Sequence, residues 1–372
     1  MTPFGNEVGA HKTSIDTPAL LLDLDAVERN LKRMFSFLKG KSVRLRPHVK
    51  LYRATPELAL MQMEAGAIGM TCAKLSEAET LAAAGITDIL IANQVVGPYK
   101  LARLADLART CNIKVAVDSL ANVKAISEAA VAQGVAVGIL VEVNIGHNRC
   151  GVAPFAPTLE LAQAVLDSPG LIFKGLMGYD GHCTLKVSES ERAVLSKQAN
   201  ALLADTRKFV EDAGVQVEIV SGSGTFTYRF ASEFDGLTEI QAGTYLLMDT
   251  AFRDHGVREF ESTLSVLTTV ISRPEYPGAG GMVVIDTGRK SVSTELGVPE
   301  VKEPQGALVR SLSDEHGRVI FEHETQRPQI GEQIELWVRD ANATINQFDR
   351  FYAMRGDTVH AVWQIPTCGR HT

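Results

Sequence analysis

The feature that most constrains the fold of this chain is a regular alternation of short apolar segments with helix-like segments. Strand-like segments recur eight times between residues 43 and 242, and stretches with helical periodicity separate most of them. This alternation predicts parallel βαβ units, and eight units within roughly 250 residues predict a closed (β/α)8 barrel. The expected strands are 43–47, 67–72, 88–92, 114–117, 137–143, 171–177, 217–222 and 238–242.

The helix-like stretches carry their own start and stop signals. Asp25 stands before the first of them, the letters SEAE open the next, and Gly134 and Gly214 follow two others. Polar side chains before the first turn and glycines after the last turn are typical of helix ends. The expected helices are 27–38, 76–84, 101–110, 120–133, 158–167 and 191–213.

An open doubly wound sheet is the rival arrangement of the same units. Such a sheet usually carries a GxGxxG turn after its first strand. Here the first expected strand is followed by HVKLYRAT, which contains no glycine. The residues therefore favour the closed barrel over the open sheet.

From about residue 260 the pattern changes to short strands between Gly and Pro clusters, and helical periodicity almost disappears. This pattern predicts a β domain. The segment PALLLDL has no place in a barrel of eight strands, so we expect it to pair with that domain. The predicted architecture is α/β, with a (β/α)8 TIM barrel over 25–258 and a β domain built from 1–24 plus 259–372. The expected β-domain strands are 264–272, 282–285, 307–311, 319–321, 334–338, 351–355 and 358–365.

Composition excludes several classes of function. The chain has 372 residues, is 45% apolar and carries a net charge of −7, so a nucleic-acid-binding surface is not expected. Its longest apolar runs, such as VAVGILVEV, are too short to span a bilayer. The first residues lack the apolar stretch of a signal peptide. Five scattered cysteines without a CxxC pair predict reduced thiols and a cytoplasmic location.

The loops that follow the expected strands carry the candidate chemistry, because barrel enzymes build their active sites there. Lys50 follows the first strand. A partly desolvated lysine loses its proton readily and can form a Schiff base, although most lysines are solvated surface residues. The loops SGSGT and QAGTY follow the seventh and eighth strands, where barrels commonly bind phosphate. Such glycine-rich loops also occur as plain turns. A phosphate cradle opposite a lysine predicts pyridoxal 5′-phosphate (PLP) as cofactor.

The motifs RPHVK, RCGV, GSGT and QAGTY, in this order, resemble the family of D-threonine aldolases, D-serine dehydratases and 3-hydroxy-D-aspartate aldolases. These are PLP enzymes with an alanine-racemase-like barrel and a β domain, and the resemblance covers nearly the whole chain. It implies that Lys50 binds the cofactor covalently, and it implies a homodimer in which the β domain of one subunit closes the barrel mouth of the other. The expected cofactor-binding residues are Lys50, His48, Arg149, Tyr179, Ser223, Gly224, Thr225, Gln241, Gly243, Thr244 and Tyr245.

The chain departs from the family pattern at a metal site near its C-terminus. Relatives carry a His-x-Cys or His-x-Asp pair there, whose divalent metal holds the substrate β-hydroxyl. The matching segment RDANATIN has Asp340 and Asn342 at the ligand positions. Two oxygen ligands disfavour zinc and would suit Mg²⁺, Mn²⁺ or Ca²⁺. The alternative is that both residues only hold a turn.

Further departures surround the expected active site. Aldolases of this family carry a base histidine in the loop after the sixth strand, and the matching position here is Leu185. His182 lies three residues earlier, and we predict that it serves as the catalytic base. Tyr52 and Arg53 stand where relatives usually have His and Lys, and Ala73 stands where a glutamine usually flanks the cofactor ring.

The predicted function is retro-aldol cleavage of a D-3-hydroxy amino acid to an amino acid such as glycine plus an aldehyde, with Lys50 and His182 as catalytic residues. Two alternatives use the same cofactor: a metal-independent amino-acid racemase or epimerase, and a D-3-hydroxy amino acid dehydratase. A PLP-carrying protein without turnover is a third, which the presence of a full β domain disfavours. The expected partner is a small amino-acid substrate, with no nucleic acid and no membrane.

Overall fold

The computed structural model describes residues 7–184 and 187–372 of the chain. These residues form two compact units. The barrel unit comprises 34–50, 56–245 and 370–372, and the β unit comprises 7–33, 51–55 and 246–369. Among the described residues, none of the helices combines the length and the apolar character needed to cross a membrane.

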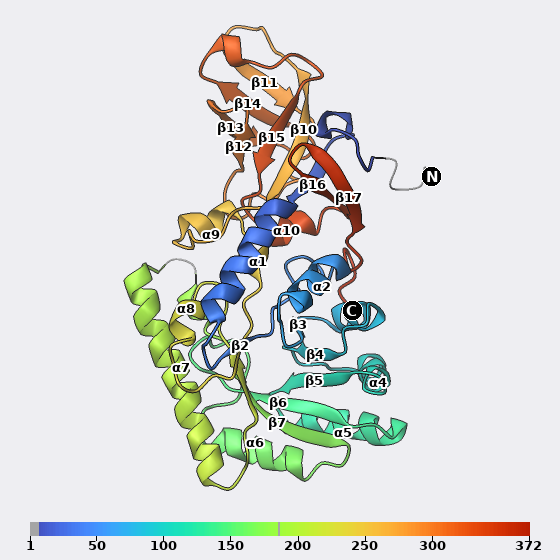
Figure 1. Cartoon of the computed structure of the whole chain (residues 1–372), viewed down its shortest axis with the longest axis vertical. Coiled ribbons are helices and arrows are strands. Elements are labelled where there is room, and N and C mark those ends of the chain that lie inside the picture. Colours follow the sequence, from blue (N-terminus) through green and yellow to red (C-terminus); the bar gives the residue numbers. More distant parts are fainter. Residues whose placement is uncertain (1–6, 185–186) are drawn as a thin grey trace. The chain divides into compact units, whose positions relative to one another are not determined.

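The barrel unit contains a parallel sheet of eight strands in the order β2-β9-β8-β7-β6-β5-β4-β3 (Figure 1). The ends of this sheet meet, because Thr71 N–H donates to Pro47 O and Val49 N–H donates to Thr71 O. The predicted eight-stranded barrel is therefore confirmed. The strands are β2 (Arg44–Leu45), β3 (Met70–Cys72), β4 (Asp88–Ile91), β5 (Asn112–Val117), β6 (Val137–Glu142), β7 (Leu171–Gly178), β8 (Ile219–Gly222) and β9 (Glu239–Ile240).

Some barrel helices begin and end at signals that their sequences carry. Ser119 accepts a hydrogen bond from Asn122 N–H at the start of α5, and Gly134 ends that helix in the left-handed conformation. Ser188 and Glu191 form a capping box at the start of α7. The helices are α2 (Pro56–Glu64), α3 (Leu75–Ala83), α4 (Pro98–Leu107), α5 (Leu120–Gln133), α6 (Ala156–Leu166), α7 (Glu189–Asp212) and α8 (Tyr228–Ala231).

Helix α1 (Leu24–Leu38) begins three residues before its predicted start. The expected cap was Asp25, but Asp23 is the residue whose carboxylate accepts from Ala26 N–H. Asp25 lies inside the first turn and forms an ion pair with Arg355 instead. Two aspartates near this helix start, Asp23 and Asp25, give more than one possible cap, so sequence alone leaves the boundary open by a few residues.

The β unit takes the N-terminal strand, as predicted. Strand β1 (Ala19–Asp23) pairs antiparallel with β10 (Leu264–Ser272) and parallel with β16 (Arg350–Arg355). The sheet order is β13-β14-β11-β10-β1-β16-β17, and β15 pairs with both β10 and β12. The remaining strands are β11 (Met282–Ile285), β12 (Glu300–Glu303), β13 (Ala307–Leu312), β14 (Gly317–Phe321), β15 (Gln333–Trp337) and β17 (Thr358–Gln364).

Three short elements of the β unit were not predicted. Strand β12 lies in a segment rich in Gly and Pro that indicated a loop, and it gains its place by pairing with β15. Helices α9 (Thr250–Asp254) and α10 (Ala341–Ile345) are each about one turn long. A single turn is too short to show helical periodicity, so these elements depend on their aspartate caps and on tertiary packing.

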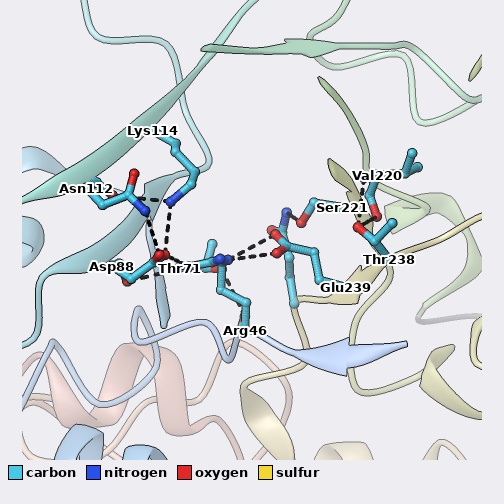
Figure 2. A network of polar contacts seen from close by, with 10 residues as sticks. Arg46, Thr71, Asp88, Asn112, Lys114, Val220, Ser221, Thr238 and Glu239 are labelled. Atoms are coloured by element: carbon cyan, nitrogen blue, oxygen red, sulfur yellow. Dashed lines mark hydrogen bonds and ion pairs between the residues drawn. The ribbon is translucent and has the colours of Figure 1, made fainter. Parts of the chain in front are cut away.

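Four charged side chains form a network inside the barrel (Figure 2). Arg46 lies between Glu239 of β9 and Asp88 of β4, and its Nε is 3.0 Å from both carboxylate oxygens of Glu239. Lys114 of β5 donates to Asp88 Oδ1 at 3.0 Å. Asp88 and Glu239 are the first residues of their strands, which places the network toward the amino ends of the strands. Residues at the amino ends of barrel strands usually contribute to stability, whereas the chemistry takes place at the carboxyl ends.

Candidate active site

The predicted cofactor and catalytic residues all lie in the barrel unit, and all follow the carboxyl ends of its strands. The structure therefore brings the loops that carry them to one end of the barrel, the end where such folds do chemistry. His48 and Lys50 follow β2, Arg149 follows β6, Tyr179 and His182 follow β7, the segment 223–225 follows β8, and the segment 241–245 follows β9.

The ring of Tyr179, which follows β7, is the common neighbour of residues from two other loops, those after β2 and β6. Lys50 Nζ lies 6.0 Å from the ring centroid, and Arg149 Cζ lies 5.4 Å from it. His147 packs edge-to-face against the same ring with 5.4 Å between the centroids. Cations near the face of an aromatic ring are attracted to its quadrupole. Tyr179 thus holds the lysine, the arginine and a histidine around one point.

Lys50 has the electrostatics expected of a reactive amine. Its side chain reaches solvent, yet its pKa is lowered because surrounding protein atoms desolvate the ammonium form and Arg149 repels it, while Glu77 opposes the shift. Burial, with the charges of Lys50 and Arg149, lowers the pKa of His48 well below its usual value. His48 is therefore neutral at pH 7, and its Nδ1 accepts from Lys50 N–H at 3.3 Å.

Burial dominates the ionisation of the residues after β7. It raises the pKa of Tyr179 to about 12, with a further contribution from the negative charge of Asp180 and an opposing one from Arg149. Burial also raises the pKa of Asp180, whose Oδ2 accepts from Ser196 Oγ at 3.1 Å. Tyr179 therefore remains a neutral phenol at physiological pH.

The two glycine-rich loops are tied to each other. Tyr245 N–H donates to Thr225 Oγ1 at 3.0 Å, and Gln241 Nε2 donates to Ser221 Oγ at 2.8 Å. Ser223 adopts a left-handed conformation with φ of +62°, and its hydroxyl bonds to Thr227 Oγ1 at 2.9 Å. A non-glycine residue in this region is strained, and such strain clusters at functional sites.

These loops present backbone donors that fit a phosphate. Within the described chain, the N–H groups of Thr225, Gly243 and Thr244 make no hydrogen bond. Nearly all backbone donors in folded proteins are paired, so three unpaired donors in two adjoining loops indicate an anion site. A side chain at Gly243 would collide with the backbone oxygen of His48, so this loop must be glycine to lie against the one that carries Lys50.

The side chain of Tyr245 has a different environment from those of the other predicted cofactor-binding residues. Its ring is fully buried, and its hydroxyl accepts from Gln62 Nε2 at 2.8 Å. Its link to the candidate cofactor site is the backbone N–H that fixes Thr225.

One residue of the site was not singled out in the sequence. His147, two residues before Arg149, lies against Tyr179 and faces His182 with 6.5 Å between the ring centroids. Within the described chain, no hydrogen bond is made by either ring nitrogen of His147, and His182 Nδ1 is buried without a partner. The position after β6 was a usable signal, because every polar residue of that loop was a candidate.

The predicted metal ligands lie in the β unit and are not arranged as a metal pair. Asp340 is the N-cap of α10: its Oδ1 accepts from Ala343 N–H at 3.3 Å, and its Oδ2 accepts from Ser293 Oγ at 2.8 Å. Asp340 is buried, whereas Asn342 is exposed. Among the described residues, no group of three or more His, Cys, Asp or Glu side chains could hold a metal ion. The two residues therefore do not fit a metal as they lie.

The remaining departures have structural settings of their own. Tyr52 is fully buried, and Arg53 exchanges hydrogen bonds with Thr367 within the β unit. Ala73 N–H donates to Glu77 Oε2 at 2.7 Å at the start of α3. Leu185, the position that matches the base histidine of relatives, lies outside the described residues.

A parallel barrel with a lysine and two glycine-rich loops at the carboxyl ends of its strands, in a chain that also forms a mostly antiparallel β unit taking the first strand, is typical of the alanine-racemase-like class of proteins. The model of the alanine racemase N-terminal domain family matches residues 22–251. The model described as a putative serine dehydratase domain matches residues 263–354.

Individual relatives narrow the class further. The chain is 38% identical to D-threonine aldolase of Arthrobacter sp. over 361 residues, 95% of this chain and 93% of the relative. It is 33% identical to 3-hydroxy-D-aspartate aldolase of Paracoccus denitrificans, over 97% of this chain and 94% of the relative. The crystal structure of D-threonine aldolase from Filomicrobium marinum superimposes with a TM-score of 0.91 at 38% identity, covering 97% of this chain and 98% of that one.

The chain belongs to the family of D-threonine aldolases and 3-hydroxy-D-aspartate aldolases. The resemblance that its motifs indicated is confirmed, as is the expectation of an aldolase, a carbon–carbon lyase. PLP is the cofactor that this family implies.

Proposed function

We propose that this protein is a PLP-dependent lyase that cleaves a D-3-hydroxy amino acid into an amino acid such as glycine and an aldehyde. One observation carries the proposal: an amine with a lowered pKa, Lys50, lies at the same barrel end as the unpaired backbone donors of Thr225, Gly243 and Thr244. An amine and an anion cradle at one barrel end match the two attachment points of PLP, its carbonyl and its phosphate.

The residues of this chain have separate tasks in holding the cofactor. When bound, PLP stabilises the electron pair that bond cleavage leaves on Cα. A lowered pKa increases the neutral fraction of the Lys50 amine at a given pH, which favours covalent attachment. The donors of the two glycine-rich loops would bind the phosphate. Arg149 would lie beside the cofactor ring, because Arg149 and Lys50 both lie against the ring of Tyr179.

Carbon–carbon cleavage also requires a base that removes the proton of the β-hydroxyl. His182 follows β7 at the same barrel end, and its Nδ1 makes no hydrogen bond within the described chain. An imidazole without a protein partner can accept a proton from substrate. We therefore assign the proton transfer from the hydroxyl oxygen to His182.

The test is a panel of D- and L-3-hydroxy amino acids in which aldehyde, keto acid and enantiomer are each assayed, with and without EDTA. Release of aldehyde and glycine from D-threonine supports the proposal. Keto acid as the main product indicates the dehydratase, and inversion at Cα without cleavage indicates the racemase or epimerase.

We expect the D configuration to be preferred. The reason is the identity to D-threonine aldolase, so the prediction is an argument from family. The measurement is kcat/KM for D-threonine and L-threonine under the same conditions. Faster turnover of the L form would contradict it.

A His182→Ala variant should lose roughly 10²- to 10⁴-fold in kcat for cleavage, which is the range that general bases supply. Its cofactor should remain bound, because the base does not anchor the cofactor. The measurement is aldehyde release together with the absorption spectrum of the purified variant. An unimpaired variant would remove His182 from the mechanism.

The predicted metal has no step in this mechanism, because both oxygens of Asp340 already accept hydrogen bonds and Asn342 lies on the surface. We expect no stoichiometric zinc in the purified protein, because an oxygen-only pair disfavours zinc, and we expect any metal requirement to be met by Mg²⁺ or Mn²⁺. Elemental analysis and titration with EDTA measure both. Tightly bound zinc would be the contrary result.

A further inference from the structure

His147 and His182 lie on different loops, after β6 and β7, and each ring occupies the space left by a glycine of the other loop. A side chain carbon on Gly146 would lie 3.1 Å from His182 Cε1 and 3.2 Å from its Nε2. A side chain carbon on Gly181 would lie 2.7 Å from His147 Cε1 and 2.8 Å from its Nε2. The Cε1–Nε2 edge of each imidazole ring therefore lies against the glycine that precedes the other histidine in the sequence.

The two rings are close to parallel, with 23° between their planes and 6.5 Å between their centroids. This separation is too long for a direct hydrogen bond between ring nitrogens. Within the described chain, no hydrogen bond is made by either ring nitrogen of His147, and His182 Nδ1 is buried and unpaired. Two paired loops thus present imidazoles whose hydrogen-bonding capacity the protein leaves unused.

We propose that His147 and His182 together hold the β-hydroxyl of the substrate, with His182 accepting its proton and His147 donating an N–H to its oxygen. A hydroxyl group donates one hydrogen bond and accepts others, so one ring nitrogen that accepts and one ring N–H that donates satisfy it. The inference rests on the proposed function and adds a second catalytic residue to it. The pair would take over the task that the altered Asp340–Asn342 segment does not fit.

The charges around the pair favour the neutral form of His147. Burial lowers the pKa of His147, and the positive charges of Arg149 and His182 lower it further. From the other loops, Lys50, Tyr179 and Asp180 face the same region, and Asp180 interacts with His182. A neutral imidazole retains one N–H to donate and one nitrogen to accept.

The proton step balances without a further reactant. The O–H bond breaks and its proton goes to His182, while the carbon–oxygen bond becomes the aldehyde carbonyl. The Cα–Cβ bond breaks, and its electron pair stays on Cα, where bound PLP would stabilise it. Return of one proton to Cα, matching the one that His182 took up, completes the amino acid and leaves the proton count unchanged. No oxidant, reductant or metal enters this account.

The test compares His147→Phe, which keeps a ring without an N–H, with His147→Gln, which keeps an N–H donor. His316→Phe, at an exposed histidine next to β14, is the matched control. Against D-threonine, kcat/KM in the presence of EDTA should fall at least about 100-fold in His147→Phe, should recover partly in His147→Gln and should not change in His316→Phe. The inhibition constant of D-2-aminobutyrate, which lacks the hydroxyl, should stay within about threefold of wild type.

A second readout does not depend on turnover. The histidine C2–H resonances of the cofactor-loaded full chain report the pKa of His147 by NMR. Since the charge of His182 lowers that pKa, His182→Asn should raise it toward the usual value for histidine. An unchanged His147 titration would show that the two rings do not act as a pair.

The outcomes separate this inference from the proposed function. A wild-type protein that cleaves no D-3-hydroxy amino acid removes the proposed function, and this inference with it. A wild-type protein that cleaves D-threonine while His147→Phe does so equally well removes the inference alone. Equal losses for D-threonine and for D-2-aminobutyrate binding would reduce His147 to a structural role, and cleavage abolished by EDTA would assign the hydroxyl to a metal.

Discussion

A Lys50→Ala variant is expected to lose at least roughly 10³-fold in kcat, because removal of a nucleophile that acts covalently costs about this much or more. It should also lose the covalently bound cofactor. The wild-type protein should be yellow, and treatment with borohydride should fix the cofactor to Lys50. The measurements are aldehyde release, the absorption spectrum and mass analysis of the labelled peptide.

The physical reason lies in the surroundings of Lys50 and not in its side chain alone. Desolvation and Arg149 lower its pKa, so a neutral amine is available at a pH where solvated lysines are charged. Lys208 provides a matched control, because it is exposed and its pKa is raised by a hydrogen bond to Asp212. Lys208→Ala should keep colour, label and activity. Labelling of a single different lysine in Lys50→Ala would show that another residue binds the cofactor.

Much of the fold could be predicted because it depends on local patterns. The eight barrel strands, the helix over 120–133 and the strands over 264–272 and 282–285 were predicted from periodicity and flanking residues, and the structure has them. The place of strand β1 in the β unit was predicted by counting strands, because a barrel of eight strands has no place for a ninth. Strand β12 and the one-turn helices α9 and α10 depend on tertiary pairing and caps, which a pattern search does not detect.

The candidate site was predictable to the extent that strand ends specify it. Lys50, Arg149 and Tyr179 follow three different strands, and the structure brings them together around one ring. The pairing of His147 with His182 could not be predicted in the same way. It depends on Gly146 and Gly181, whose missing side chains make room for the opposite ring, and that fit exists only in three dimensions.

The charged network inside the barrel also could not be predicted from the sequence. Arg46 and Glu239 are separated by 193 positions, and both are almost fully buried. No local pattern connects two such residues. They meet because β2 and β9 are neighbours in the closed sheet, with Arg44 opposite Glu239 in the register.

A Glu239→Ala variant is expected to destabilise the protein by about 3–5 kcal/mol, the usual cost of removing one partner of a buried ion pair. It leaves the Arg46 guanidinium buried beside Asp88 and Lys114, so that two positive groups share one carboxylate. Urea denaturation of the wild type and the variant measures the difference. The milder Glu239→Gln keeps the shape and a hydrogen-bond acceptor, and it should lose less.

Glu218→Ala is the control for this prediction. Glu218 pairs with Lys174 at 2.7 Å but is largely exposed, so its removal should cost about 0–1 kcal/mol. The network also implies a dependence on pH. Burial pushes the pKa of Asp88 upward, but Arg46 and Lys114 outweigh it and lower that pKa. The stability that Asp88 contributes is therefore present above its unfolded pKa and is lost as the pH falls through its folded pKa.

In Glu239→Ala the excess of positive charge around Asp88 grows, because Arg46 no longer has its second carboxylate. Protonation of Asp88 then leaves both cations buried without any negative partner. The variant starts from a lower stability and also loses the Asp88 contribution as the pH falls, so it should unfold at a higher pH than the wild type during acid titration, followed by circular dichroism. An acid transition at the same pH, with a urea midpoint equal to that of Glu218→Ala, would show that the barrel does not depend on this network for stability.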